Sequence, residues 1–437
     1  MEKATYNHSV TLREDKCKGC TNCLRRCPTE AIRIRGGHAR IDASRCIDCG
    51  ECIRVCTHKA KKAKYDLLSV LDPYTYKIAL PAPSLYGQFN NLEDLDYLID
   101  GLHRIGFDEV YEVSRAAEAV TAYTRRYLKK PGVKLPVISS ACPAVSRLIS
   151  LRYPGLCEHL LPIRSPMELA ATAARKKALA EHPGLTSDQI GIAFISPCPA
   201  KISFVKNRPE NDKTDVDVVL SMSEVYFALL GVMRQDIVPA HYSESGMLGV
   251  GWASTGGEST ALFNEKYLAA DGIENVIRVL DHLEDGSLSE LEFIELNACN
   301  AGCTGGVLTV ENPYIAGARL TNLRRTLPIS RTMLRKEDGQ DELFIPEEVC
   351  RPDPFTYEPA KALGDTFDEA MDKMARIERI YARLPDHDCG SCGSPTCRSF
   401  AEDVVKGEVT EDECIVNMRA LIEDLAKRID YRNFEKE

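Results

Sequence analysis

Apolar and polar positions alternate through the middle of the chain in a pattern that predicts strands separated by helices. Two segments, 92–106 and 116–130, have apolar residues at the three- and four-residue spacing of amphipathic helices. Shorter apolar runs that predict strands lie at 76–83, 107–113, 134–140, 190–197 and 291–296. Strands that alternate with crossover helices form parallel sheets covered on both faces. We therefore expect a large α/β domain with mostly parallel sheets over residues 66–358.

The last part of the chain has a different pattern. Residues 367–384 have helical apolar spacing, and "RSFAEDVVKG" at 398–407 predicts a second helix. We expect residues 359–437 to form a small helical domain, with its first helix packed against the core of the protein.

The composition indicates a globular protein that needs no disulfide scaffold. The chain has 437 residues, 44% of them hydrophobic, which is enough for two or three domains with their own cores. The first 20 residues contain no apolar stretch behind a basic one, and nowhere do about 18 apolar residues run together. We therefore expect a cytoplasmic protein with no membrane span. The net charge of −10 argues against nucleic-acid binding.

The 18 cysteines gather in tight groups, which in a reducing compartment indicates metal ligands and not disulfides. Residues 17–27 and 46–56 each have the spacing C-x2-C-x2-C-x3-C of bacterial two-cluster ferredoxins, in which the fourth cysteine of each run binds the other run's cluster. Residues 1–65 are therefore expected to form a small α+β ferredoxin-like domain with two [4Fe-4S] clusters. The two ligand sets are Cys17, Cys20, Cys23 and Cys56, and Cys46, Cys49, Cys52 and Cys27. Zinc sites are the alternative, but zinc favours C-x2-C pairs with longer gaps.

A further group of cysteines in the C-terminal part has the arrangement C-x2-C-x4-C-x16-C and consists of Cys389, Cys392, Cys397 and Cys414. A glycine-rich loop holds the first three, and the predicted helix 398–407 leads the chain back to the fourth. Residues 385–418 resemble the four-cysteine [4Fe-4S] domain of the Rnf electron-transfer complex and of corrinoid iron-sulfur proteins. The resemblance implies a [4Fe-4S] cluster, while four thiolates in a small domain suit Zn²⁺ equally well.

The cysteine sites of the large domain follow one rule. Cys142, Cys198, and the pair Cys299 and Cys303 each come just after a predicted strand. Open α/β sheets bind ligands at the carboxyl ends of their strands, so these loops are expected to meet and to hold one more [4Fe-4S] cluster.

Two features fall outside these groups. Cys157 and Cys350 are expected to be ordinary packing or surface thiols. The basic run at 58–64 is expected to be a solvated linker face, with a docking patch for an acidic partner as the alternative.

Three loops of the large domain resemble, in order and spacing, the signature loops of the [FeFe]-hydrogenase catalytic domain: "SSACPAVSR" at 139–147, "SPCPAK" at 196–201 and "ELNACNAGCTGG" at 295–306. With the ferredoxin-like lead-in, the resemblance covers nearly all of residues 10–355. It implies that Cys142, Cys198, Cys299 and Cys303 hold the [4Fe-4S] part of an H-cluster, which reacts with H2 and protons. It also implies that Cys303 bridges to a diiron subsite with CO, cyanide and azadithiolate, inserted by maturation enzymes.

The resemblance assigns further residues one at a time. Lys201 matches the lysine that hydrogen-bonds a cyanide ligand, with a surface lysine as the alternative. Ala82 and Pro83 match small residues near the other cyanide. Ser165 matches a serine that contacts the same ligand, although a serine before a proline is equally typical of a helix cap. The small residues around Cys303 are expected to let a large cofactor approach the backbone.

The chain departs from the family pattern where protons move. Ala141 stands in place of a cysteine that relays protons to the bridging amine, and Thr124 and Tyr127 stand in place of two glutamates that pass the proton outward. Ser196 and Asn297 replace two methionines near the diiron site, and the polarity there sets its redox potential. Loss of a positioned acid or base typically costs about 10²- to 10⁴-fold in rate.

Slow proton transfer through Ser140, Ser196 or water, combined with an added four-cysteine domain, favours H2 sensing over metabolism. Members of the family with the same alanine and added domain look like sensory hydrogenases. We expect slow reversible H2 oxidation, with electrons relayed through three accessory [4Fe-4S] clusters to a redox or signalling protein partner. Two alternatives stay open: a low-activity hydrogenase linked to ferredoxin, and a non-catalytic hydrogenase-like protein without the diiron subsite. Lys201 argues against the second alternative, because a cubane alone needs no cyanide-binding lysine.

Overall fold

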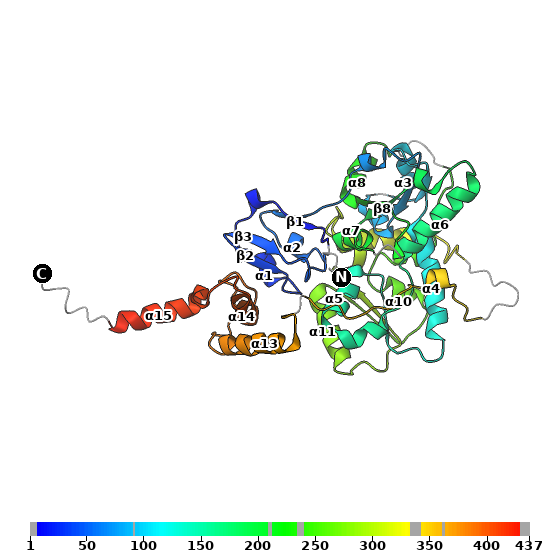
Figure 1. The fold of residues 1–437 in the computed structure, drawn as a ribbon. Coiled ribbons are helices and arrows are strands. Elements are labelled where there is room, and N and C mark those ends of the chain that lie inside the picture. Colours follow the sequence, from blue (N-terminus) through cyan, green and yellow to red (C-terminus); the bar gives the residue numbers. More distant parts are fainter. Residues whose placement is uncertain are drawn as a thin grey trace.

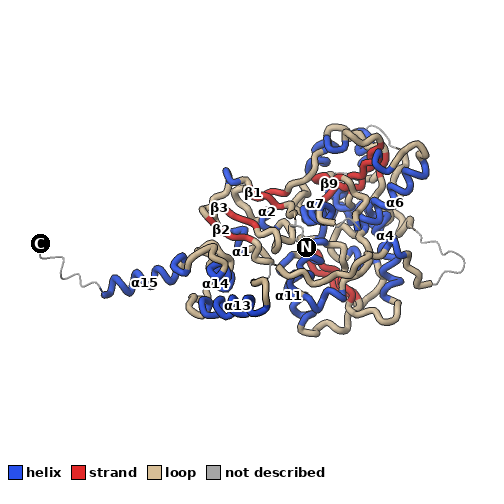
Figure 2. The backbone as a smooth tube through the Cα atoms, viewed as in Figure 1, coloured by secondary structure: helices blue, strands red, loops and turns tan. Residues whose placement is uncertain are grey.

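The computed structural model describes residues 7–90, 92–208, 212–233, 240–332, 342–360 and 363–428. The chain forms a small ferredoxin-like part, a large part with parallel sheets and a helical C-terminal part (Figure 1). The predicted fold class is therefore confirmed. Figure 2 shows the strands inside the large part with helices around them.

The ferredoxin-like part contains two antiparallel strand pairs, β1 with β4 and β2 with β3, and two one-turn helices. Its elements are β1 (Val10–Leu12), α1 (Asn22–Arg25), β2 (Ile32–Arg35), β3 (His38–Ile41), α2 (Glu51–Arg54) and β4 (Lys61–Ala63). The expectation of a solvated linker at 58–64 was wrong for Lys61, because pairing of β4 with β1 leaves this side chain only 3% exposed. Lys62 and Lys64 point the other way and are exposed.

The large part contains two parallel sheets and not one. The first has the order β6-β5-β8-β9 and the second the order β10-β11-β7. Their strands are β5 (Tyr76–Pro81), β6 (Glu109–Val110), β7 (Val137–Ile138), β8 (Ile190–Ser196), β9 (Val218–Ser221), β10 (Tyr267–Asp271) and β11 (Phe293–Asn297). The predicted strand at 107–113 is shorter than expected, since the following helix already begins at Val113.

Apolar strand residues hold each sheet in a core of its own. In the first sheet, Ile78, Leu80, Ile192 and Phe194 are at most 1% exposed. Helices cover both sheets, as crossover connections require. These helices are α3 (Asp96–Arg104), α4 (Val113–Leu128), α5 (Pro143–Arg152), α6 (Pro166–Glu181), α7 (Pro199–Lys206), α8 (Met222–Leu230), α9 (Met247–Gly251), α10 (Gly257–Ala261), α11 (Ile273–Glu284) and α12 (Pro313–Arg324).

The C-terminal part consists of α13 (Phe367–Tyr381), α14 (Cys397–Val405) and α15 (Ile415–Arg428), of which α15 extends away from the rest (Figure 1). We expected the first of these helices to pack against the main core. Instead Ile377 and Ile380 of α13 pack against Phe400 of α14, within the C-terminal part.

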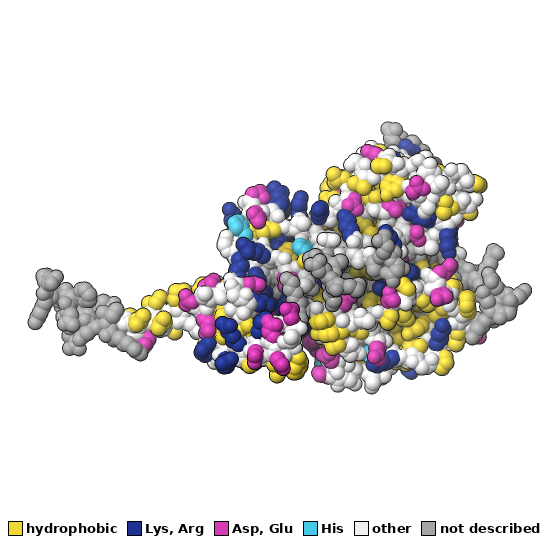
Figure 3. Space-filling model, viewed as in Figure 1, with side chains coloured by type: hydrophobic (Ala, Val, Ile, Leu, Met, Phe, Trp, Pro, Cys, Tyr) yellow, Lys and Arg dark blue, Asp and Glu magenta, His cyan; other side chains and the backbone are white. Residues whose placement is uncertain are grey.

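The C-terminal part docks on the ferredoxin-like part. The Ile34 N–H of β2 donates to the Gly393 carbonyl at 2.8 Å. The buried Asp403 carboxylate of α14 accepts from Arg33 and Arg35, each at 2.6 Å. Figure 3 shows Lys and Arg side chains on the ferredoxin-like part, and at the contact itself Arg45 pairs with Glu402 in the same way. Within the described residues, no helix is long and apolar enough to cross a bilayer.

Candidate functional site

Four cysteine thiols meet where strands of the two parallel sheets end. Cys142 precedes α5 after β7, and Cys198 precedes α7 after β8. Cys299 and Cys303 follow β11, and Cys303 lies in a short 3₁₀ turn. The thiols are close enough to interact: burial is the main cause that raises the pKa of Cys198 to about 11, the charges of Cys303 and Cys142 add to the rise, and the charge of Lys201 opposes it. The loops that the strand-end rule selected therefore converge, while the ligand role of their thiols stays a prediction.

These thiols fit a metal cluster better than they fit free cysteines. Burial and the neighbouring thiols raise the pKa of Cys299, which disfavours a free thiolate there. A bound cation removes this penalty, because it deprotonates the thiols that coordinate it. Arg54 of the ferredoxin-like part adds a positive charge close to Cys299 and donates to the Gly305 carbonyl at 2.8 Å.

Lys201 is a half-buried cation in the first turn of α7 and lines the cavity beside Cys303. Its ammonium group lies 3.5 Å from the Ala141 carbonyl oxygen. Burial disfavours the charged ammonium, but the charges of the four thiols outweigh burial and raise the pKa of Lys201. A surface lysine is therefore ruled out at this position, and the charge of Lys201 stabilises anions beside Cys303.

Two glycines of the Cys303 loop have a structural reason within the protein itself. Gly302 has a φ of +75°, and a Cβ there would lie 2.7 Å from the Thr255 backbone nitrogen. A Cβ on Gly306 would lie 2.2 Å from the Pro197 carbonyl oxygen. These two glycines let neighbouring protein backbone approach the loop, and the expectation that the loop also makes room for a cofactor stays a prediction.

A cavity of about 70 Å³ lies beside Cys303. All but one of the proposed diiron-site residues line it: Ala82, Pro83, Ala141, Ser165, Lys201, Asn297 and Cys303. Ser165 also caps α6, since its N–H donates to the Glu168 carboxylate at 2.9 Å. Ser196 is the exception: its hydroxyl donates to the Cys198 carbonyl at 2.9 Å, and it does not line the described part of the cavity.

Two glutamates that the sequence analysis did not select line the same cavity. Glu258 lies in α10 and Glu295 in β11, and they are 4% and 3% exposed. The Ser139 hydroxyl donates to Glu258 Oε2 at 2.6 Å, while Glu258 Oε1 is buried without a hydrogen-bond partner in the described residues. Burial and then the charge of Glu295 raise the pKa of Glu258 well above its usual range.

Glu295 accepts more hydrogen bonds than Glu258 does. It accepts from the Gly256 and Ser259 N–H groups and from the Asn297 amide, each at 2.9 Å. Burial raises the pKa of Glu295, and these N–H donors oppose the rise. Glu258 therefore holds a proton more readily, and Glu295 holds the negative charge. A glutamate inside the apolar run 291–296 was the one sequence signal for this pair.

The eight cysteines of the ferredoxin-like part lie around two separate cavities of about 20 Å³ each. One is lined by Cys17, Cys20, Cys23 and Cys56, and the other by Cys27, Cys46, Cys49 and Cys52. This is the crossed grouping that the spacing predicted. Lys61 lines the first cavity, where its charge opposes the burial that raises the pKa of Cys23 to about 11.

The C-terminal cysteines form a fourth group. Burial raises the pKa of Cys392, and the charges of Cys389 and Cys414 add to the rise. Cys397 is the first residue of α14. Iron-sulfur and zinc occupancy both remain compatible with this group. Of the two leftover thiols, Cys157 is buried and Cys350 is half-buried, as packing residues are.

Comparison with known proteins gives a match for each part of the chain. Residues 75–265 match the family model of the iron only hydrogenase large subunit, C-terminal domain, a range that includes Cys142, Cys198 and Lys201 and ends before Cys299. Residues 9–57 match the 4Fe-4S dicluster domain, and residues 384–416 match an Fe-S cluster family. The chain is thus an iron-sulfur protein with a hydrogenase-like large domain.

Curated relatives agree with these matches. The NADP-reducing hydrogenase subunit HndD of Solidesulfovibrio fructosivorans is 24% identical over 250 residues, which cover 48% of this chain and 42% of that one. Iron hydrogenase 1 of Clostridium pasteurianum is 24% identical over 296 residues, covering 54% and 50%. The corrinoid/iron-sulfur protein large subunit of Moorella thermoacetica is 46% identical over 35 residues, covering 8% of each chain. The chain spans about half the length of the curated hydrogenases it matches.

Solved structures of [FeFe]-hydrogenases are similar as well. One, studied for oxygen inactivation of its H cluster, has a TM-score of 0.48 and 16% identity, covering 65% of this chain and 95% of that one. A variant of HydA1 from Chlamydomonas reinhardtii has a TM-score of 0.45 and 18% identity, covering 60% and 86%.

Proposed function

We propose that this protein binds H2 at an H-cluster and interconverts it slowly with protons and electrons, in a sensing role. One observation carries the proposal: the cavity beside Cys303 contains Lys201 and the alanine Ala141, and its acid groups are the buried carboxyls of Glu258 and Glu295. The site thus has residues that suit an anionic diiron group, and its acid groups come from α10 and β11.

The side chains fit both inorganic groups that such a function needs. Cys142, Cys198, Cys299 and Cys303 would hold a [4Fe-4S] cluster, and Cys303 would also hold the diiron group. Lys201 would donate to a cyanide ligand, since its ammonium is buried and charged at this cavity. When bound, the diiron group supplies the metal centre at which H2 is split heterolytically.

Glu258 is the side chain best suited to hold the transferred proton. Its raised pKa keeps the carboxyl protonated, and Ser139 fixes only one of its two oxygens. The other oxygen has no hydrogen-bond partner in the described part of the chain, so it can donate or accept inside the cavity. When the proton leaves Glu258, the negative charge falls on Glu258 itself, which keeps the hydrogen bond from Ser139. Glu295 keeps the charge that its three N–H donors stabilise.

The slow rate and the sensing role rest on two features. Glu258 and Glu295 are both buried and share a single proton. This proton must be replaced from solvent before each turnover, and burial slows that exchange. The four-cysteine C-terminal part adds an electron site that docks directly on the ferredoxin-like part. We propose that electrons pass through these accessory sites to a redox or signalling protein, and that maturation enzymes load the diiron group.

Infrared spectroscopy of anaerobically matured protein tests the proposal. We expect CO and cyanide stretching bands that shift when H2 is added. Cys303→Ala is the matched control, because it removes the thiolate that would join the two inorganic groups and should abolish the bands. No bands in the matured wild-type protein would instead support a hydrogenase-like protein without the diiron subsite.

Ala141→Cys then separates a sensor from a working hydrogenase. A sensor limited by proton supply gains H2 turnover when a thiol at position 141 adds an acid group to this cavity. A working hydrogenase that moves protons by another route does not respond. Film electrochemistry, in which the electrode supplies electrons directly, measures this difference.

A further inference from the structure

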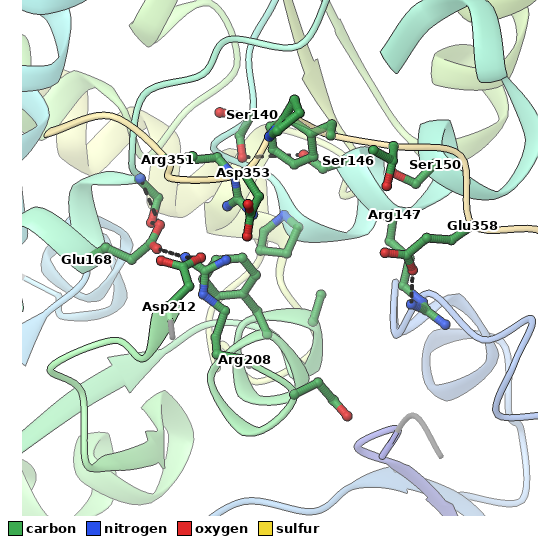
Figure 4. A pocket seen from close by; sticks show the side chains of 18 of the residues that line it. Ser140, Ser146, Arg147, Ser150, Glu168, Arg208, Asp212, Arg351, Asp353 and Glu358 are labelled. Carbon is green, nitrogen blue, oxygen red and sulfur yellow. Dashed lines mark hydrogen bonds and ion pairs between the residues drawn. The ribbon is translucent and has the colours of Figure 1, made fainter. Parts of the chain in front are cut away.

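A second cavity, of about 580 Å³, lies between α5, α7 and the segment 351–358 (Figure 4). Ser165 lines both this cavity and the one beside Cys303. Its volume is in the range that holds a drug-sized ligand. The proposed function leaves this space unused.

One end of the second cavity contains a closed ring of charges. Arg164 lies 3.4 Å from Glu168 and 2.7 Å from Asp212, and Arg208 lies 2.6 Å from Glu168 and 2.8 Å from Asp212. Two cations and two anions therefore neutralise one another. This ring has no charge left to balance a further neighbour.

Arg351 is such a neighbour, and it is a cation without a counterion. No carboxylate of the described residues lies within 4.0 Å of its guanidinium, and its Nε is buried without a hydrogen-bond partner there. Burial and then the charge of Arg208 lower the pKa of Arg351, while the charges of Glu168 and Asp212, which form no direct ion pair with it, oppose the shift. An uncompensated, partly buried cation is unfavourable unless an anion reaches it.

The guanidinium of Arg351 is held in place by an aromatic ring. Its Cζ lies 4.3 Å from the ring centre of Phe355, and Arg208 stacks on Phe204 in the same way at 4.6 Å. Stacking leaves the guanidinium edge open for two parallel hydrogen bonds, the geometry that suits carboxylate and phosphate oxygens. The cation is therefore oriented before any ligand arrives.

The opposite wall of the cavity carries hydroxyl groups and few unpaired charged side chains. Ser146 and Ser150 are one turn apart on α5, so both face the cavity (Figure 4). Arg147 is engaged by the Cys46 carbonyl at 2.9 Å and by Glu358 at 3.8 Å. Asp353 is an exposed residue on the same segment as Arg351.

We propose that this cavity binds a small hydroxylated organic anion, whose carboxylate or phosphate pairs with Arg351 and whose hydroxyl groups face Ser146 and Ser150. The site adjoins the Cys303 cavity at Ser165, but binding there requires neither the diiron group nor any cluster chemistry. Its test is therefore independent of the proposed function.

Titration calorimetry on the full chain at low ionic strength tests this site, with citrate, glycerol 3-phosphate and inorganic phosphate as separate probes. We expect saturable binding of at least one organic anion and weaker binding of inorganic phosphate, which cannot reach the serines at the same time. Citrate alone would assign a carboxylate ligand, and glycerol 3-phosphate alone would assign a phosphate ester. Arg351→Gln should weaken the binding at least tenfold.

Arg278→Gln is the matched control, because it removes the same charge from an exposed position on α11 and should leave the affinity unchanged. If Arg351→Gln does not fold, Arg351→Lys serves in its place: it keeps the charge but loses the planar fork, and should still bind several-fold more weakly. Absence of saturable binding to the wild type overturns the proposal. So does an affinity that Arg351 substitution does not change, or that Arg278→Gln lowers equally.

Discussion

Two cavities that share Ser165 bury two pairs of carboxylates in opposite surroundings. Glu258 and Glu295 are 4% and 3% exposed, and Glu168 and Asp212 are 2% and 4% exposed, so burial does not distinguish them. Glu168 and Asp212 each face two arginines, whereas the described residues place no ion pair on Glu258 or Glu295. The partners of a buried carboxyl, and not its depth, decide whether it holds a charge or a proton.

The largest effect should come from removing the exchangeable proton. Glu258→Gln keeps the shape of the side chain and its bond from Ser139, but the amide cannot give up a proton at any working pH. We expect H2 turnover to fall by about 10²- to 10⁴-fold. Turnover is measured on matured protein whose infrared bands match the wild type, so that loss of the diiron group is excluded.

Glu284→Gln is the control for this variant, because Glu284 is exposed at the end of α11. It should leave turnover unchanged. Wild-type turnover in Glu258→Gln would show that protons leave by another route, and the contrast between the two carboxylate pairs would then have no catalytic meaning.

Breaking the ion pairs of Glu168 and Asp212 should instead lower the stability of the folded protein. Arg208→Met leaves Glu168 and Asp212 with Arg164 alone, and we expect the free energy of unfolding to fall by about 3–5 kcal/mol. Anaerobic urea unfolding, with variant and wild type in the same metal state, measures this loss. Glu258→Gln should not lower the unfolding free energy, because it replaces a neutral buried group by another neutral group. Equal losses in the two variants would contradict the distinction.

The sequence predicted the parts of the site that depend on local spacing. The crossed grouping of the ferredoxin-like cysteines follows from two short runs, and the structure brings the same cysteines together around two cavities. The strand-end rule likewise selected the loops of Cys142, Cys198 and Cys303. In each case the signal lay within a few residues of the side chain concerned.

What the sequence did not predict depends on pairing between distant segments. β7 pairs with β11, far along the chain, and the strand pattern alone does not indicate which strands share a sheet. The sequence analysis did not select Glu295, because the strand around it is mostly apolar. Its partner Glu258 comes from a separate helix. Lys61 was misjudged because only pairing of β4 with β1 turns it inward.

Asp403 lies between these two cases. It is a buried carboxylate whose charge is balanced by arginines from another part of the chain. It is 1% exposed and accepts from Arg33 and Arg35. Asp403→Asn should weaken docking of the C-terminal part by about 1.5–3 kcal/mol. The Ile34 amide, which donates to Gly393, should then exchange its hydrogen roughly tenfold to hundredfold faster.

Glu402→Gln is the neighbouring control. Glu402 pairs with Arg45 at 2.8 Å, but both side chains are about one-fifth exposed, so the change should be smaller. Unchanged exchange at Ile34 in Asp403→Asn would show that the apolar and backbone contacts hold the two parts together without this carboxylate.

The last expected effect is on the pH dependence of stability, and it has a definite sign. The folded-state pKa of Glu258 is raised, so the folded protein binds one proton more than the unfolded chain between the two pKa values. That contribution is complete below the unfolded pKa of about 4.3 and is lost as pH rises through the folded value. Glu258→Gln has no such proton, so its stability relative to wild type should increase with pH, by up to about 1.4 kcal/mol per pH unit. Urea midpoints of both proteins between about pH 5 and pH 8 measure this difference. A constant difference over that range would mean that Glu258 is ionised throughout.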